Sequence, residues 1–232
     1  MPPYSIKTGY ESILEFGSSQ MREITINMPI YGEVHTLNIG LDENSALLPP
    51  SDYIPGSPIV FYGSSTTHGA CASRPGNTYP AIISRRLNSD ILNLGFSGSA
   101  RAEDEIAEYI AGLDMKIFVY DYDHNAPDPE HLEKTHERMF KIFREKHPET
   151  PVIMMTSPSL LKNREVAEKR KEIIRTTYLN AINSGDKNVY YLDGEEIMAP
   201  CGLDGTVEGI HPNDLGFFFM AKAVGDVIEK II

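Results

Sequence analysis

Five short apolar runs, each followed by a longer segment with helical spacing, constrain the fold of this chain more than any other feature. The runs are IVFY (59–62), ILNL (91–94), IFVY (117–120), VIMMT (152–156) and VYYL (189–192). They are apolar throughout instead of alternating, which is typical of strands buried on both faces. Strands that alternate with helices join through right-handed crossovers into a parallel sheet. The pattern therefore predicts a three-layer α/β/α fold with a doubly wound parallel sheet.

The segments between and after the runs carry helix signals. Asn77 or Thr78 can cap the segment that starts TYPAIISRRLN, and Pro80 falls in its first turn. Acidic residues open the next segment, where the helix dipole favours them. The helical segments expected are 78–88, 102–113, 128–147, 164–183 and 214–232.

The first 55 residues have a different pattern and are predicted to form a short β-rich extension ending in a linker. Apolar and polar residues alternate in 22–30 and 33–41, and Tyr31-Gly32 between them is a turn signal, so a β-hairpin is expected. Prolines then mark LLPPSDYIPGSP as the linker. The predicted domains are 1–55 and 56–232. The extension could pair with another chain as an exposed edge, so a homo-oligomer stays open.

Charge and composition limit the partners. The chain has 232 residues, 41% of them hydrophobic, which is enough for a large core, and a formal net charge of −12. Such an acidic surface repels phosphate backbones and argues against nucleic-acid binding. The sequence shows no signal peptide and no apolar stretch long enough to span a membrane. Its two cysteines fit reduced thiols, so a cytoplasmic location is expected.

Polar residues follow the predicted strands at the points where the strands end. Ligands of open α/β sheets bind outside the carboxyl ends of the strands. Hydroxyl residues follow the first run in 63–68, a glycine turn follows the second in 95–100, and an asparagine follows the third in 121–127. A histidine lies in 204–216, before the last helix. These segments are expected to meet at one edge of the sheet.

This set of residues suits acyl transfer. The reaction needs a nucleophile with a base in reach, a group that orients the base, and donors for the oxyanion. A serine in a tight turn after a buried strand can be the nucleophile, and His211 the base. Glu208 can reach Nδ1 of His211. Gly98 can donate a backbone N–H, and Asn125 a side-chain amide.

Other interpretations of nearby residues are weaker. His68 lies close to the serines in sequence, but a histidine in a Gly/Ser loop is usually solvated. Asp121, Asp123 and His124 could be metal ligands, but neighbours in an extended chain point in different directions, and no metal site is predicted. Cys71 is expected to be a small buried thiol. No organic cofactor is expected either.

Four blocks in this order resemble the SGNH (GDSL-type) serine hydrolase superfamily. They are GSSTT, NLGFSGSA, DYDHNAP and EGIHPND. The resemblance covers about residues 56–232 and implies a flavodoxin-like hydrolase fold. It implies that Ser65 is the nucleophile, His211 the base and Glu208 the acid. The oxyanion donors implied are Ser65, Gly98 and Asn125. GACASRPGNTYPAIISRRL further resembles a bacterial subgroup with a β-rich domain ahead of the hydrolase domain, of which 1–55 would be a remnant.

The sequence departs from the superfamily pattern at two positions. Ser64 stands where the first block usually has Asp, which leaves Ser64 as an alternative nucleophile. Glu208 stands where the last block usually has Asp, and the extra methylene shifts the carboxylate by about a bond length, which matters for catalytic geometry. Reduced activity is therefore expected, with a gain from Glu208→Asp. Asp204 is the reserve acid.

The resemblance implies a serine esterase or deacylase for short, acetyl-like esters, with carbohydrate esters as candidate substrates. Two alternatives stay open. One is a non-catalytic ligand-binding relic of the fold, suggested by Glu208 and the short N-terminal extension. The other is an acyltransferase that uses the same three residues.

Overall fold

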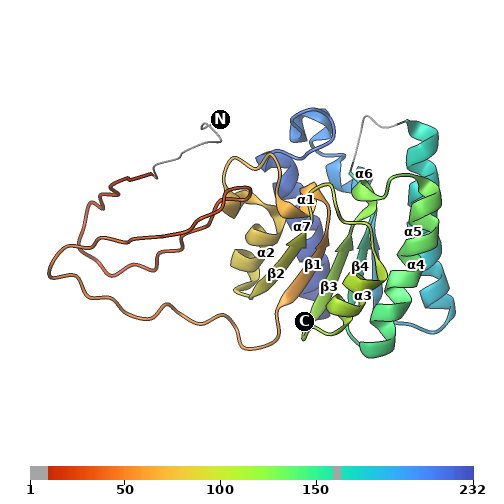
Figure 1. Cartoon of the computed structure of the whole chain (residues 1–232), viewed down its shortest axis with the longest axis horizontal. Helices are drawn as coiled ribbons and strands as arrows, with labels where there is room; N and C mark the ends of the chain where they lie inside the picture. Colours follow the sequence, from red (N-terminus) through yellow and green to blue (C-terminus); the bar gives the residue numbers. More distant parts are fainter. Residues whose placement is uncertain (1–9, 159–162) are drawn as a thin grey trace. The chain divides into compact units, whose positions relative to one another are not determined.

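The apolar runs form one parallel sheet. The computed structural model of this chain describes residues 10–158 and 163–232. The strands are β1 (Ile59–Gly63), β2 (Ile91–Gly95), β3 (Ile117–Asp121), β4 (Val152–Met155) and β5 (Val189–Leu192). All are parallel, in the order β2-β1-β3-β4-β5 (Figure 1). Each strand falls on a predicted run, so the predicted doubly wound α/β fold is confirmed.

Helices connect the strands and follow the last one. The longer helices are α2 (Tyr79–Leu87), α3 (Asp104–Ala111), α4 (Pro129–Lys146), α5 (Arg164–Asn183) and α7 (Asp214–Ile231). The shorter elements are α1 (Ser65–His68), η1 (Pro75–Asn77), η2 (Asp123–Asn125), α6 (Gly194–Met198) and η3 (Gly202–Gly205), where η denotes a 3-10 helix. Side chains that accept backbone N–H groups cap the starts of α2, α4, α5 and α7, as Thr78 does for α2.

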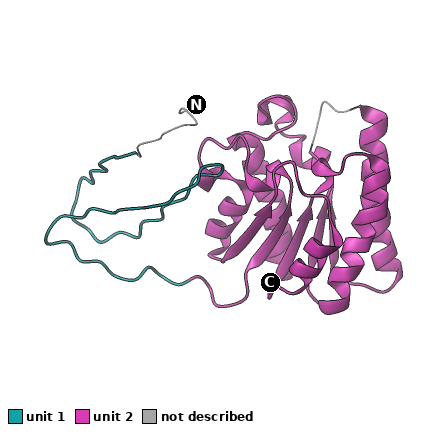
Figure 2. Ribbon diagram, in the orientation of Figure 1, with its two compact units in different colours: residues 1–52 teal, residues 53–232 magenta. Residues whose placement is uncertain are grey.

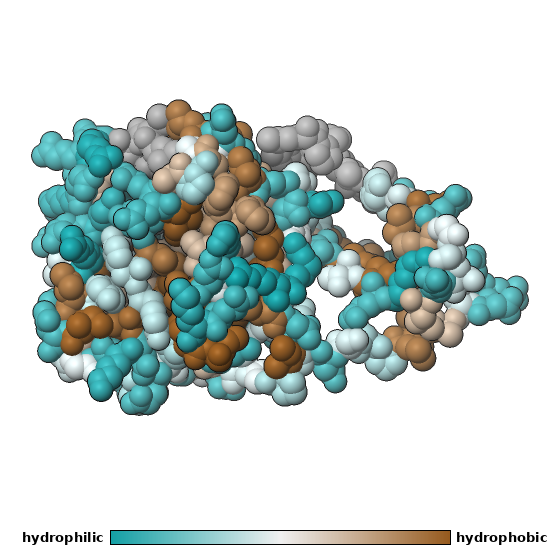
Figure 3. Space-filling model, turned by 180° about the vertical axis from the view of Figure 1, so that it is seen from behind, coloured by the Kyte–Doolittle hydropathy of each residue, from teal (hydrophilic) through white to brown (hydrophobic). Residues whose placement is uncertain are grey.

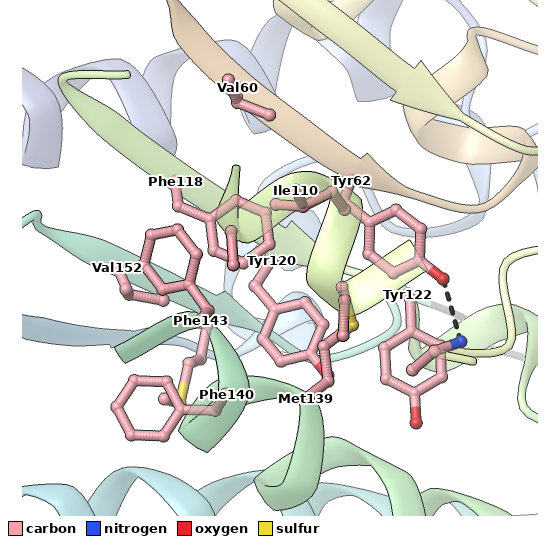
Figure 4. Close-up of a cluster of buried hydrophobic side chains, with 14 of the residues drawn as sticks. Val60, Tyr62, Ile110, Phe118, Tyr120, Tyr122, Met139, Phe140, Phe143 and Val152 are labelled. Atoms are coloured by element: carbon pink, nitrogen blue, oxygen red, sulfur yellow. Dashed lines mark hydrogen bonds between the residues drawn. The ribbon is translucent and has the colours of Figure 1, made fainter. Parts of the chain in front are cut away.

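Two hydrophobic cores lie on the two faces of the sheet. Alternate strand residues point to opposite faces. Val60 and Tyr62 of β1 pack with side chains of α3, α4 and α5 (Figure 4). Ile59 and Phe61 pack on the other face with side chains of α2, α6 and α7. Burial on both faces explains why β1, β3 and β4 are almost entirely apolar, whereas the half-buried strand β2 includes the exposed Asn93.

The strand order has a reversal point between β1 and β3. Chain direction across the sheet reverses there, because the chain passes from β1 outward to β2 and then returns to β3 on the other side. In the register, Gly63 is opposite Gly95 on β2 and Asp121 on β3. The loops after these three strands therefore start at one level. This is the topological switch point, where open α/β sheets bind ligands.

The N-terminal segment does not contain the predicted hairpin. The chain divides into two units, residues 1–52 and 53–232 (Figure 2). Residues 10–52 contain no strand, and all are exposed except Ile30, which is half-buried. Hydrophobic and hydrophilic side chains intermingle on the surface of this unit (Figure 3). An isolated two-stranded hairpin is only marginally stable without further strands or a helix to pack against, which explains why the alternating pattern alone does not produce one.

Within the described ranges, no helix is both long and apolar enough to cross a bilayer.

Candidate active site

Ser65 lies at the start of α1, directly above the end of β1. Gly63 makes this close packing feasible: a Cβ there would lie 2.0 Å from Thr67 Oγ1 and 2.2 Å from the carbonyl oxygen of Asp121. A side chain at this position would push α1 off the strand end. The glycine in GSSTT therefore has a packing role, and it brings the serines to the edge of the sheet.

The two adjacent serines have different surroundings. Ser64 is fully buried, and its Oγ caps α1 by accepting the N–H of Thr66 at 3.2 Å. Ser65 is only partly buried, and its Oγ lies 2.9 Å from Nε2 of His211. Ser65 is thus the serine that has a base within hydrogen-bond distance, and Ser64 has a structural contact instead.

His211 connects Ser65 to a carboxylate. Its Nδ1 lies 2.5 Å from Oε1 of Glu208, and its backbone N–H donates to the same oxygen at 2.8 Å. Burial raises the pKa of Glu208, but the hydrogen bonds from His211 outweigh it and hold that pKa below its usual value. The reserve acid Asp204 is exposed, and its backbone carbonyl accepts the side-chain amide of Asn213 at 2.7 Å.

The loop that carries His211 is attached to the loop that follows Ser65. Asp214, at the first position of α7, accepts the backbone N–H of Ser73 at 2.8 Å and its hydroxyl at 2.5 Å. The same carboxylate accepts the side-chain amide of Asn77 at 2.8 Å. These contacts join segments about 140 residues apart, and they hold the histidine loop beside the serine loop. No sequence pattern indicates these contacts.

Gly98 and Asn125 lie on the neighbouring loops after β2 and β3. Gly98 has a φ of +76°, which side chains disfavour, and a Cβ there would meet nothing within 4 Å. Asn125 ends η2 and is half-buried, and its Oδ1 accepts the backbone N–H of Ala100 at 3.2 Å. This contact ties the two loops together. Because Oδ1 of Asn125 accepts this hydrogen bond, the amide points its Nδ2 in the other direction, where it can donate.

Asp121 lies beneath α1 and is fully buried. Its Oδ2 accepts hydrogen bonds from Thr67 at 2.9 Å and Tyr79 at 3.0 Å, while its Oδ1 has no partner among the described residues. Burial raises the pKa of Asp121 to about 7, although the two hydrogen bonds oppose the rise. Through these two hydrogen bonds, Asp121 links the end of β3 to Thr67 of α1 and to Tyr79 of α2.

Asp121, Asp123 and His124 do not come together as metal ligands. Asp123 pairs with the buried Arg170 at 3.1 Å and accepts the N–H of Ser157 at 2.7 Å. The ring of His124 lies 3.0 Å from the Ser157 hydroxyl. These different partners agree with the expectation that neighbouring side chains point apart. Arg170 was not identified from the sequence, because nothing in a helical pattern indicates which arginine is buried.

Cys71 differs from the expected buried thiol. It is exposed, and its backbone has a φ of +69°. Its thiol belongs to a group with Glu208 and His211 whose ligand atoms all lie within 4.8 Å of one another. Burial and, second, the charge of Glu208 raise the pKa of Cys71. This proximity could not be predicted from sequence because Cys71 and His211 are distant along the chain. His68, the other histidine near Ser65, is half-buried at the end of α1.

The fold and these contacts define a class of protein. It is a doubly wound α/β protein with a serine, a histidine and a glutamate in one hydrogen-bonded series at the switch point of the sheet. The profile of the GDSL-like lipase/acylhydrolase family matches residues 56–229, and the chain belongs to that family.

Solved structures of other proteins share the fold. A candidate GDSL-like lipase from Bacteroides ovatus is 35% identical, with a TM-score of 0.68 over 75% of this chain and 53% of that one. A salicylyl-acyltransferase from a tetracycline biosynthetic pathway is 22% identical, with a TM-score of 0.67 over 78% and 56%. A family two carbohydrate esterase from Clostridium thermocellum, in complex with cellohexaose, is 18% identical, with a TM-score of 0.60 over 79% and 66%.

This chain thus spans about half the length of the first two of these structures. Below 25% identity the likeness concerns the fold alone. No curated protein sequence matches the chain.

Proposed function

We propose that this protein is a serine esterase that hydrolyses short-chain, acetyl-like esters. One observation carries the proposal: Ser65 Oγ lies 2.9 Å from Nε2 of His211, whose Nδ1 lies 2.5 Å from Glu208. A hydroxyl, an imidazole and a carboxylate in this series form the arrangement that activates serine for attack on a carbonyl. Membership of the GDSL-like family supports the same reaction class.

The proposed reaction has two stages. His211 takes the proton of Ser65 as Oγ attacks the ester carbonyl, and it then passes that proton to the leaving alcohol. Water, activated by the same imidazole, releases the acid and restores the serine. Glu208 holds the proton of His211 on Nδ1, so that Nε2 faces Ser65 with its lone pair, and it stabilises the imidazolium.

The proposed oxyanion donors are the backbone N–H groups of Ser65 and Gly98 and the side-chain amide of Asn125. The hydrogen bond from Ala100 to Oδ1 of Asn125 supports this role, because it turns the amide nitrogen toward a different partner. Loss of one such donor costs about a hundred- to a thousand-fold in turnover.

The proposed substrates are acetyl-like esters of carbohydrates. The family resemblance supports this choice, and a carbohydrate esterase is among the proteins that share the fold. The half-exposed positions of Ser65 and His211 are consistent with access by a large substrate such as a sugar chain.

Hydrolysis of p-nitrophenyl acetate and butyrate, followed by acetylated sugars, tests the proposal. Wild type is expected to turn over the acetate ester, and Ser65→Ala to lose at least about a thousand-fold, as enzymes of this type do without the nucleophile. Ser64→Ala is the matched control and should retain most turnover, since Ser64 caps α1 instead of contacting His211. Turnover unaffected by Ser65→Ala would overturn the assignment.

A fluorophosphonate probe separates the alternatives. An active serine is expected to label at Ser65, whereas a ligand-binding relic would not label. An acyltransferase would label but would hydrolyse slowly and speed up when an alcohol acceptor is added. Labelling at Ser65 with fast hydrolysis in water alone is the result expected for an esterase.

A further inference from the structure

The thiol of Cys71 lies beside the proposed catalytic residues but has no part in the proposed reaction. Its sulfur, a carboxylate oxygen of Glu208 and a ring nitrogen of His211 are all within 4.8 Å of one another. Cys71 and Glu208 are exposed and His211 is half-buried, so the group is open to ions from solution. Among the described residues, this is the one cluster of three or more His, Cys, Asp or Glu side chains that could hold a metal ion.

These ligand types match a particular kind of cation. Thiolate, imidazole and carboxylate together bind Zn²⁺ and similar thiophilic ions, whereas Mg²⁺ and Ca²⁺ prefer oxygen ligands alone. Ligand atoms of a tetrahedral zinc site lie about 3.3–3.8 Å apart, given metal–ligand bonds of about 2.0–2.3 Å. Because the ligand atoms lie within 4.8 Å of one another, no pair has to approach by more than about 1.5 Å to reach this spacing. Side-chain rotation can provide such a shift and can also separate Nδ1 of His211 from Oε1 of Glu208, which are now 2.5 Å apart. Three protein ligands would leave a fourth position for water.

The backbone holds the three residues in place. The N–H of Ala70, next to Cys71, donates to the carbonyl of Ser65 at 2.8 Å. On the other side, Ser73 is bound to Asp214, close to His211 in the chain. Cys71 is thus attached both to the serine loop and to the histidine loop, so its proximity to His211 does not depend on a free chain end.

We propose that Cys71, Glu208 and His211 form a binding site for one thiophilic divalent cation such as Zn²⁺. Binding exchanges the thiol proton for the metal: the S–H bond breaks, a sulfur–metal bond forms, and the proton passes to solvent. No oxidation or reduction is involved. The negative charge of the chain favours the approach of a cation.

The bound cation would inhibit the esterase, and this part rests on the proposed function. Coordination through Nδ1 leaves the ring proton on Nε2, so His211 could no longer accept the proton of Ser65. Coordination through Nε2 uses the same lone pair directly. In either case Glu208 also turns from the imidazole to the metal. A bound ion therefore removes the general base.

Direct binding is tested on the full chain with Cd²⁺, whose bond to thiolate absorbs in the ultraviolet. Wild type is expected to bind one Cd²⁺ with a thiolate absorption band. Cys71→Ser should lose this band and weaken binding at least tenfold. Cys201→Ser is the matched control, because it removes the other cysteine and should retain the band. A band that is absent from wild type, or that persists in Cys71→Ser, would overturn the site.

Inhibition is tested separately with Zn²⁺. Hydrolysis of p-nitrophenyl acetate by wild type and Cys201→Ser should fall with added Zn²⁺ and recover with a chelator, and Mg²⁺ at equal concentration should have no effect. Cys71→Ser should need at least tenfold more Zn²⁺. If no ester is hydrolysed, the proposed function fails while the Cd²⁺ band still decides on the site. If the ester is hydrolysed rapidly but no Cd²⁺–thiolate band appears, the cation site is refuted and the proposed function stands.

Discussion

At the scale of single residues, Glu208 contacts His211 more closely than the sequence pattern of the family suggests. The extra methylene, compared with the usual Asp, was expected to misplace the carboxylate. Instead, one oxygen of Glu208 accepts both the ring and the backbone N–H of His211, at 2.5 and 2.8 Å. The longer side chain thus reaches both N–H groups of His211 in this loop.

We therefore expect Glu208→Asp to lower activity instead of raising it. The shorter side chain cannot keep both contacts without movement of the loop, and small displacements in a catalytic group cost up to about a hundred-fold. Values of kcat for p-nitrophenyl acetate, compared among wild type, Glu208→Asp and Glu208→Gln, provide the measurement. A kcat of Glu208→Asp above that of wild type would show that Glu208 is a poor substitute for Asp.

Asp121 predicts a pH dependence of stability. Its pKa, raised by burial to about 7 in the folded protein, lies above the unfolded value of 3.8. The folded state therefore keeps a proton that the unfolded chain loses, so the stability contribution of Asp121 is greatest below the unfolded pKa. It declines as pH rises toward about 7 and levels off above, with a slope of up to about 1.4 kcal/mol per pH unit.

Asp121→Asn should remove this dependence, because the amide is neutral throughout and can still accept from Thr67 and Tyr79. Urea unfolding between pH 4 and 8 should show the variant gaining stability relative to wild type as pH rises. The exposed Asp204, changed to Asn, is the control. A difference between wild type and Asp121→Asn that is constant with pH would contradict the expectation.

At the scale of elements, α5 holds the turn that carries Asn125. Arg170 of α5 donates to the carbonyl oxygen of Asp123 at 2.8 Å, to its carboxylate at 3.1 Å, and to the carbonyl of Ala126 at 2.7 Å. Both side chains of the ion pair are more than nine-tenths buried. A single arginine thus fixes η2 from both ends and positions the loop that follows β3.

Arg170→Met is expected to destabilise the protein by about 3–5 kcal/mol, because it leaves the charge of Asp123 buried without its partner. Adding Asp123→Asn should recover part of the loss, since the amide is neutral and its oxygen can still accept the N–H of Ser157. Free energies of unfolding in urea for the single and double variants test this. Equal losses in the single and double variants would show that the ion pair is not the cause.

At the scale of the whole molecule, the two cores lie entirely within the second unit. The buried residues of both clusters fall between Ile59 and Ile228, and residues 10–52 contribute none. The second unit therefore contains the apolar packing that folding needs, and it also contains every residue of the candidate site.

Residues 53–232 alone are expected to fold cooperatively. Their free energy of unfolding should lie within about 1 kcal/mol of that of the full chain, because no core contact is removed. Circular dichroism with urea, together with hydrolysis of p-nitrophenyl acetate, makes the comparison. Loss of the cooperative transition on removal of 1–52 would show that the first unit stabilises the second.

The five strands and the five longer helices of residues 59–231 could be predicted because their signals are local, whereas the short helices at the strand ends were not predicted. Apolar runs mark buried strands, and caps such as Thr78 mark helix starts, whatever the rest of the chain does. The same local reasoning was wrong for residues 22–41. There the alternation is present, but a hairpin also needs a surface to pack on, and that requirement cannot be found in a period-2 pattern.

The sequence by itself determined the fold class, the family and the residues at the strand ends, because hydrophobic periodicity and block order survive without coordinates. Only the tertiary structure decided which groups meet. It separated the capping Ser64 from Ser65, matched Glu208 to His211, buried Arg170 against Asp123 and exposed Cys71 beside the imidazole. These outcomes depend on packing between segments far apart in the chain, and distances of that kind are set by the assembled sheet instead of by any stretch of sequence.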